Sequence, residues 1–149
     1  MIAWDGKTLA ADRLIASDNL RCHSTTKIVR TPRGLFGWAG RASAAGDILA
    51  WFAAGAAPEK FPDSNRDGDN CTHLLHIAND GIINLYETGP YPILVHGTQM
   101  AIGAGADAAM ATMYLGYDAT KAVEVASAIV SGCGNGIDTL ELAETKGQP

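Results

Sequence analysis

The chain has 149 residues, of which 47% are hydrophobic and 18% are charged, and this balance excludes an intrinsically disordered protein. Lys and Arg number 11 against 16 Asp and Glu, a net charge of -5, and without a basic cluster we expect no binding to nucleic acid. The apolar runs are too short to cross a bilayer and no basic-then-apolar leader is present, so we expect a cytoplasmic protein without membrane contact.

The chain begins with an apolar segment, whereas most domains begin with a polar tail. Residues 2–4 are apolar and β-prone, Asp5-Gly6 is typical of a two-residue type I′ turn, and residues 8–11 are apolar again. We therefore expect a β-hairpin at the start of the chain, with its first residue in the core.

A second hairpin is expected after a polar stretch at residues 16–26. Residues 27–30 and 35–40 have strand character, and Thr31-Pro32-Arg33-Gly34 between them has the residues preferred in a β-turn. Gly37 lies inside the second of these strands, where a glycine indicates the close approach of another backbone or of a ligand.

The rest of the chain predicts helices and strands in an order that does not produce a parallel βαβ sheet. The helices are expected at residues 44–54, with Ser43 as the N-cap, and then at 107–115 and 119–130. The strands are expected at residues 71–78, 82–87, 93–95, 100–102 and 137–142. Antiparallel strands around helical segments predict an α+β sandwich of a single domain at residues 1–149, with 143–149 as a frayed tail.

Metal and cofactor motifs are weak in this sequence. The three cysteines, Cys22, Cys71 and Cys133, form no CxxC pair, and no HExxH occurs, so we expect no zinc site, no disulfide framework and no cofactor. Residues 103–108 fit the relaxed pattern G-x-G-x-x-[GA], but the helix that follows leads into another helix rather than a strand, which favours structural glycines.

A calcium loop is a competing interpretation of residues 63–69. This segment matches the first half of an EF-hand loop, but the twelfth position is Leu74 in place of a bidentate Glu, and a strand follows in place of a helix. A solvated loop is the simpler interpretation. A small-molecule or metal-binding module that uses this loop stays open as an alternative function.

Asp12 and Lys27 stand out because both lie at the edges of expected strands in neighbouring hairpins. They could form a surface ion pair, worth less than about 1 kcal/mol. Alternatively, a buried carboxylate could hold the lysine beside a nucleophile. The pairing alone does not choose between these interpretations.

The chain resembles proteasome β-subunits, and most closely the bacterial HslV-type peptidases with their short bacterial and phage relatives. The segments that carry the resemblance are residues 1–14, 27–29, 37–40 and 101–105. The resemblance implies the N-terminal-nucleophile hydrolase fold, a four-layer αββα sandwich with two antiparallel sheets. It also implies a threonine-type peptidase, in which the free N-terminal threonine attacks a peptide carbonyl.

The resemblance also implies roles for individual residues. Asp12 matches the aspartate that positions the lysine, and Lys27 matches the lysine that keeps the hydroxyl reactive. Gly37 matches the glycine whose N–H forms the oxyanion hole. Leu35 and Ala39 would line the specificity pocket.

The sequence departs from the family at three positions. The family begins Thr-Thr-Ile, whereas here Met1 stands directly before Ile2 in the nucleophile's place. Ala104 stands where the family has a supporting serine. The position of the family's second aspartate falls near Ala128, so that aspartate looks lost here. We therefore expect a catalytically impaired or inactive protein. An active peptidase or amidohydrolase stays open if the mature N-terminus differs, either within Ser24-Thr25-Thr26 after self-cleavage or upstream of Met1.

The resemblance further implies an assembly. Relatives form six- or seven-membered rings, often stacked in pairs, and some act with an ATPase partner. We therefore expect a homo-oligomeric ring with a structural or regulatory role, in which the alanine-rich helices at residues 44–54 and 107–115 could supply contacts between subunits.

Overall fold

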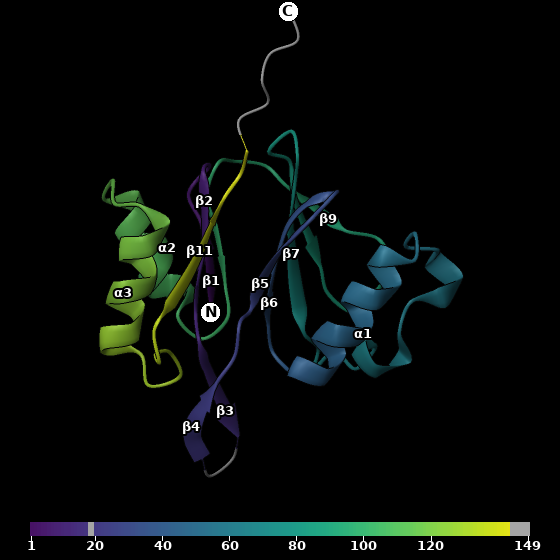
Figure 1. Cartoon of the computed structure of the whole chain (residues 1–149), viewed down its shortest axis with the longest axis horizontal. Coiled ribbons are helices and arrows are strands. Elements are labelled where there is room, and N and C mark those ends of the chain that lie inside the picture. The colour runs from purple at the N-terminus through teal and green to yellow at the C-terminus, as the bar shows by residue number, and fades with distance from the viewer. Residues whose placement is uncertain (18–19, 144–149) are drawn as a thin grey trace, which may run out of the picture.

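Four layers, helix–sheet–sheet–helix, make up this protein (Figure 1). The structure is a computed structural model that describes residues 1–17 and 20–143, with the side chains of residues 16–22 outside the description. Most of the expected tail, residues 144–149, also lies outside the described residues. The expected α+β sandwich with two antiparallel sheets is confirmed.

The first sheet has the strand order β10-β1-β2-β11, and all its neighbouring strands are antiparallel. Its strands are β1 (Ile2–Trp4), β2 (Thr8–Asp12), β10 (Met100–Ile102) and β11 (Ile137–Glu141). The second sheet has the order β5-β6-β7-β8-β9 and is also antiparallel. Its strands are β5 (Ile28–Thr31), β6 (Gly34–Ala39), β7 (His73–Ala78), β8 (Ile83–Tyr86) and β9 (Ile93–Val95).

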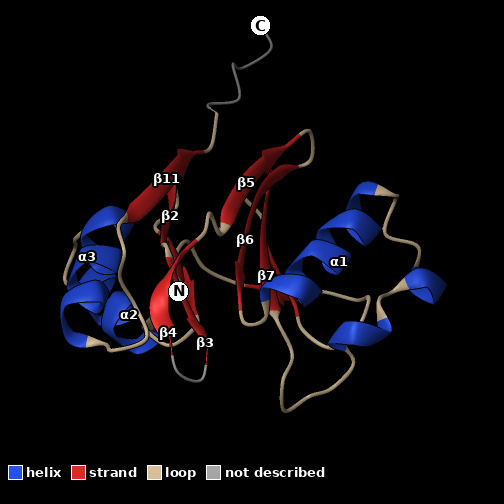
Figure 2. Ribbon diagram, turned by 60° about the horizontal axis from the view of Figure 1, so that its bottom comes forward, coloured by secondary structure: helices blue, strands red, loops and turns tan. Residues whose placement is uncertain are grey.

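Helices cover the outer face of each sheet, as both views show (Figures 1 and 2). Helices α2 (Ala106–Tyr114) and α3 (Ala119–Ile129) cover the first sheet, and α1 (Ala42–Ala53) covers the second. The short 3-10 helices η1 (Pro58–Lys60) and η2 (Asp63–Asn65) follow α1. Among the residues described, no helix combines the length and the apolar character needed to cross a bilayer.

Three hydrophobic cores separate the four layers, and their compositions differ. The core between the sheets is built from large aliphatic side chains together with Trp4. The core under α2 and α3 consists mainly of alanines, and such small side chains let the helices lie close to the first sheet. The core under α1 is aromatic, with Trp51 and Phe52 packed edge-to-face against neighbouring rings.

Strand β1 alternates its side chains between two of these cores. Ile2 and Trp4 face the second sheet, whereas Met1 and Ala3 face α2 and α3. All four are at most 3% exposed, so the beginning of the chain is buried on both faces. The expectation that the first residue lies in the core is confirmed.

The turn between β1 and β2 differs from the expected type I′ turn. It is one residue longer, and of its residues Gly6 alone has a positive φ, at 99°. The carboxylate of Asp5 accepts hydrogen bonds from the backbone N–H groups of Lys7 and Thr8 and closes an Asx turn. Its second oxygen accepts from the N–H of Ala119 at 2.8 Å, which ties the turn to the start of α3.

Two further local predictions were wrong. No strand was expected between Asp12 and Lys27, yet β3 (Leu14–Ser17) and β4 (Leu20–Ser24) form a hairpin there. The apolar run in β3 is only three residues long, and β4 is mostly polar. Helix α1 begins at Ala42 with Arg41 as its N-cap, so Ser43 lies in the first turn. The Arg41 side chain does not cap the helix. Its guanidinium donates to the backbone carbonyls of Ser64 in η2 and of Asn70 in the loop that follows η2.

Candidate active site

A buried carboxylate, that of Asp12, lies at the end of β2 and is surrounded by hydrogen-bond donors. Its Oδ1 accepts from the amine of Met1 at 2.5 Å and from Lys27 Nζ at 2.8 Å. Its Oδ2 accepts from the backbone N–H groups of Leu14 at 3.2 Å and Gly134 at 3.0 Å. The side chain is 0% exposed, so these four donors take the place of the water that an ionised carboxylate requires.

Lys27 reaches this carboxylate from the second sheet, because it immediately precedes β5. Its side chain is only 7% exposed, and its backbone carbonyl accepts from the N–H of Trp38, which fixes it against β6. The ion pair with Asp12 is therefore buried, which rules out the surface-pair interpretation. Removing either partner would leave the other charge uncompensated in the interior.

The amine of Met1 is buried beside the same carboxylate. Burial lowers the pKa of this amine below its ordinary value near 8.0, and the nearby charge of Lys27 lowers it further, while the hydrogen bond to Asp12 opposes both effects. More of the amine is therefore neutral at neutral pH than in a free chain end. A neutral amine can accept a proton, as a general base must.

The pKa of Asp12 is shifted by opposing effects. Burial alone would raise the pKa of this carboxyl, but the hydrogen bonds from Lys27 and from the Met1 amine outweigh it and lower the pKa below the ordinary value of 3.8. Asp12 is therefore ionised at neutral pH. One anion thus faces two nitrogen groups, a lysine and an amine.

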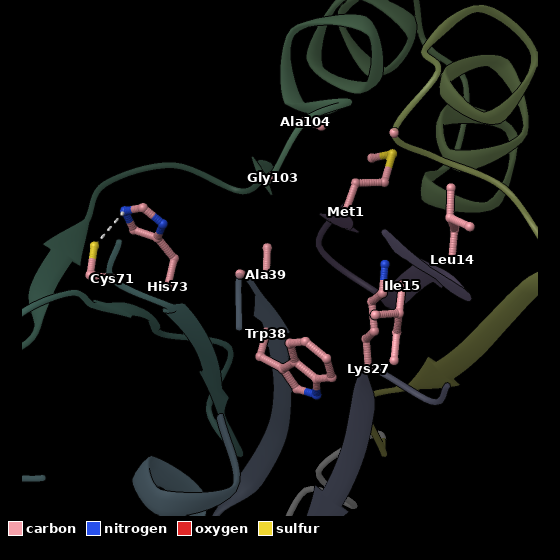
Figure 3. A pocket seen from close by; sticks show the side chains of 12 residues that line it. Met1, Leu14, Ile15, Lys27, Trp38, Ala39, Cys71, His73, Gly103 and Ala104 are labelled. Carbon is pink, nitrogen blue, oxygen red and sulfur yellow. Dashed lines mark hydrogen bonds between the residues drawn. The ribbon is translucent and has the colours of Figure 1, made fainter. Parts of the chain in front are cut away.

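A cavity of about 320 Å³ opens beside this centre (Figure 3). Its wall is mostly apolar, and its charged or titratable side chains are Lys27, Cys71 and His73. The residues that line it are Met1, Leu14, Ile15, Lys27, Trp38, Ala39, Gly40, Cys71, His73, Gly103, Ala104 and Gly132. Within the described part of the chain, this lining holds no serine or threonine side chain.

Glycines at residues 103 and 105 fit closely around Met1. Gly103 has φ +95°, and a Cβ there would lie 2.9 Å from the Met1 Cα. A Cβ on Gly105 would lie 2.6 Å from the Met1 Sδ and 2.8 Å from the Cys133 Sγ. These glycines therefore accommodate the first residue, which agrees with a structural role for the G-x-G pattern.

A thiol and an imidazole form the opposite wall of the cavity. The Cys71 Sγ lies 3.9 Å from the His73 Nε2, and the same Nε2 lies 3.3 Å from a carboxylate oxygen of Glu87. Both contacts use one ring nitrogen, so the imidazole cannot hold a thiol proton on one side while the carboxylate orients it from the other. This group does not have the geometry of a Cys–His–acid triad.

The structure brings together most of the residues that the sequence singles out. Met1, Asp12 and Lys27 form the buried charged centre, and Ala39 and Ala104 line the cavity beside it. The catalytic roles assigned to these residues stay predictions.

Two residues expected at the site lie outside the cavity lining. Leu35 is fully buried in the core between the sheets, so its place in a specificity pocket is not supported. Gly37 lies under Ile2, where a Cβ would come within 2.7 Å of the Ile2 Cγ2. The close approach of the first sheet therefore accounts for this glycine.

Several lining residues were missed from the sequence. Trp38 precedes the expected Ala39 in β6, and Gly40 follows it directly after the strand, so their adjacency in sequence to Ala39 could have indicated them. Cys71 and His73 come from the neighbouring strand region, and no sequence pattern links them to Lys27.

The loop at residues 63–69 is organised around an amide rather than around a cation. Asn65 is 0% exposed, and its side chain bonds the backbone N–H and carbonyl of Thr72 and the carbonyl of Glu87. In the described ranges, 1–17 and 20–143, no three His, Cys, Asp or Glu side chains group as metal ligands would.

Comparison with known proteins gives a match in fold without a match in sequence. No family model matches the chain, and no curated protein sequence matches it. Among solved structures, HslV from Trypanosoma brucei superposes with a TM-score of 0.73 at 18% identity, over 94% of this chain and 97% of that one. Thiobacillus denitrificans BPH in complex with epoxomicin gives 0.67 at 16% identity, over 95% and 98% of the two chains.

A second structure of Thiobacillus denitrificans BPH gives a TM-score of 0.62 at 16% identity, over 96% of this chain and 98% of that one. These likenesses cover nearly the whole of each chain. The HslV/proteasome N-terminal-nucleophile hydrolase fold inferred from the sequence is therefore confirmed, at the level of the fold.

Proposed function

We propose that this chain is an HslV/proteasome-type subunit with the threonine-peptidase scaffold, and that it binds peptides without hydrolysing them while Met1 is its first residue. The observation that supports this most is the buried amine–Asp12–Lys27 centre beside a cavity whose described lining lacks a hydroxyl. The Met1 thioether carries no proton to lose, so it cannot replace a hydroxyl as the attacking group.

Turnover of short fluorogenic peptides tests the absence of hydrolysis. We expect the chain to release no fluorophore above the buffer rate, and we expect Lys27→Ala to behave in the same way. Turnover that is lost in Lys27→Ala would overturn the inactive assignment, because it would show that the lysine already serves a competent nucleophile.

Peptide binding needs a separate measurement, because an inactive subunit still has its cavity. Fluorescence anisotropy with labelled peptides is expected to show binding that weakens in Ala104→Leu, whose larger side chain enters the cavity. Ala54→Leu, an exposed position after α1, is the matched control. Equal affinity in both variants would exclude this cavity as the binding site.

We also propose assembly into a homo-oligomeric ring. Support comes from exposed apolar side chains at the turn between α2 and α3, where Tyr114 is 88%, Leu115 74% and Tyr117 55% exposed. Native mass spectrometry is expected to show a closed oligomer that Leu115→Ser weakens. A wild-type monomer at micromolar concentration would contradict a ring, and added ATPase partners can be tested in the same experiment.

Self-cleavage at Ser24-Thr25-Thr26 fits the fold poorly as a route to an active N-terminus. It would remove β1 and β2, the two central strands of the first sheet, together with Asp12. Intact-mass spectrometry of the natively expressed protein identifies the first residue directly. A mass that begins within residues 24–26 would support the active-peptidase alternative.

A further inference from the structure

The side chain of Met1 points away from the charged centre that its own amine occupies. It is 3% exposed and lies in the core under α2 and α3, with its Sδ against Gly105. Figure 3 shows this side chain directed toward the helices, whereas Lys27, Trp38 and Ala39 lie on the other side of the Met1 backbone. The alternation of β1 explains this direction, since Ala3 faces the same helices.

The lysine lies next to the backbone nitrogen of Met1, not next to its side chain. Asp12 Oδ1 joins the two groups, at 2.5 Å from the Met1 nitrogen and 2.8 Å from Lys27 Nζ. Lys27 comes from the second sheet, the side that Ile2 and Trp4 face. A hydroxyl on the side chain of residue 1 would therefore lie on the helix side of the Met1 backbone, opposite the side from which Lys27 approaches.

We infer that the nucleophile position of this scaffold is the residue joined to the nitrogen of Met1, and not Met1 itself. A side chain there falls on the face of Ile2, toward Lys27 and the cavity, by the same alternation of β1. The Met1 nitrogen, as an amide N–H, still donates to Asp12. This inference rests on the proposed peptidase scaffold and specifies where its chemistry takes place.

The reaction of a threonine added at that position balances with water as the co-reactant. Its hydroxyl oxygen bonds to the peptide carbonyl carbon, and the hydroxyl proton passes to the new N-terminal amine. The carbon–nitrogen bond of the peptide then breaks, and the leaving amine takes that proton. Water attacks the ester, releases the acid and restores the hydroxyl.

Placement can be tested without any activity by comparing two cysteine variants. One full-length chain carries a single cysteine added before Met1, and the other carries Met1→Cys. Both mature N-termini are verified by intact mass. Both variants are alkylated with iodoacetamide in the presence of a non-thiol reductant, and peptide mapping measures the rate at each cysteine. The partly exposed Cys71 serves as the internal reference. We expect the added cysteine to react about tenfold faster or more, because thiol reactivity follows exposure and nearby positive charge.

The activity arm uses an added threonine against Met1→Thr, with fluorogenic peptides as substrates. We expect turnover from the added threonine at about 100-fold or more above background, a factor typical of positioned acid–base groups, and background turnover from Met1→Thr. Lys27→Ala in the added-threonine chain should abolish that turnover.

The two arms separate the possible failures. If Met1→Cys is alkylated as fast as the added cysteine, or if Met1→Thr alone hydrolyses peptide, the inferred position is overturned. If the added cysteine reacts fast but the added threonine gives no turnover, the position stands and the proposed peptidase scaffold fails.

Discussion

Replacing Asp12 by asparagine removes the negative charge that, among the described residues, pairs with both Lys27 and the Met1 amine. The amide keeps the volume of the carboxyl but can accept hydrogen bonds at only one of its two ends. Because donors approach both oxygens of Asp12, the new NH₂ group must face either the two nitrogen groups or the two backbone N–H groups. Either orientation leaves buried donors unsatisfied and leaves Lys27 without a counter-charge.

The expected cost follows from this burial. Removing one partner of a buried ion pair lowers the free energy of unfolding by about 3–5 kcal/mol, a large part of the roughly 5–15 kcal/mol of a typical domain. For a chain of this size, 1 kcal/mol corresponds to about 2–4 °C, so the Tm should fall by roughly 6–20 °C. Lys27→Met added to Asp12→Asn should recover part of the loss, because it removes the stranded charge.

Urea unfolding followed by circular dichroism measures this change, with Asp63→Asn as the matched control. Asp63 also pairs with a cation, Arg66 at 2.8 Å, but its side chain is 97% exposed, so its replacement should cost less than about 1 kcal/mol. If Asp12→Asn lowers the free energy of unfolding no more than the control does, the description of the centre as a buried ion pair is refuted.

Four further predictions concern the pH dependence of stability and the packing of the interior. The free energy of unfolding should fall at acid pH, because the lowered pKa of Asp12 gives stability that is complete above about 3.8 and lost as pH falls through the folded-state value. It should rise as pH approaches 8.0, since the lowered pKa of the Met1 amine makes the folded state bind fewer protons there. Gly37→Ala should cost about 1–3 kcal/mol by overpacking against Ile2. Asn65→Ala should cost about 1–3 kcal/mol or more, because it leaves buried backbone groups unsatisfied. Urea titrations of each variant, and of the wild type over a pH series, give all these values.

Each of these predictions has a control. Asp12→Asn should lose the acid dependence, and acetylation of the amine should remove the rise toward pH 8.0. Gly89→Ala adds a methyl group in open space and should be close to neutral, as should Asn70→Ala on the surface. A pH dependence that survives both modifications would assign it to other groups, and equal losses in variant and control would contradict the packing arguments.

The architecture could be predicted from the sequence because burial in this fold follows simple periodicities. Residues 2–4 and 9–11 are apolar throughout because their strands are buried on both faces, between the core of the two sheets and the core under α2 and α3. Asp12 and Lys27 were brought together by reasoning from adjacent strand edges, and the structure places them 2.8 Å apart. The hairpin of β3 and β4 was missed because the apolar run of β3 is only three residues long and β4 is mostly polar.

The lining of the cavity was harder to predict than the architecture. The sequence shows which face of a strand is buried, but it does not show at which residue along the strand the core ends and the cavity begins. Leu35, Gly37 and Ala39 share one face of β6 by their spacing of two. Only Ala39, at the end of the strand, reaches the cavity, whereas Leu35 is covered by the other sheet. The direction of the Met1 side chain likewise depends on pairing that no short motif encodes.

The hydrogen bonds around Asp12 also determine how late in synthesis and folding this region can reach its native structure. They link Met1 to Lys27 and to the N–H of Gly134, just before β11, the last strand in the described part of the chain. A ribosome makes residue 1 well before residue 134, so the Met1 nitrogen and Asp12 lack part of their surroundings until Gly134 has been made. Contacts between such distant segments close late in folding. The fold thus keeps Met1 without its full surroundings until the segment that carries Gly134 exists.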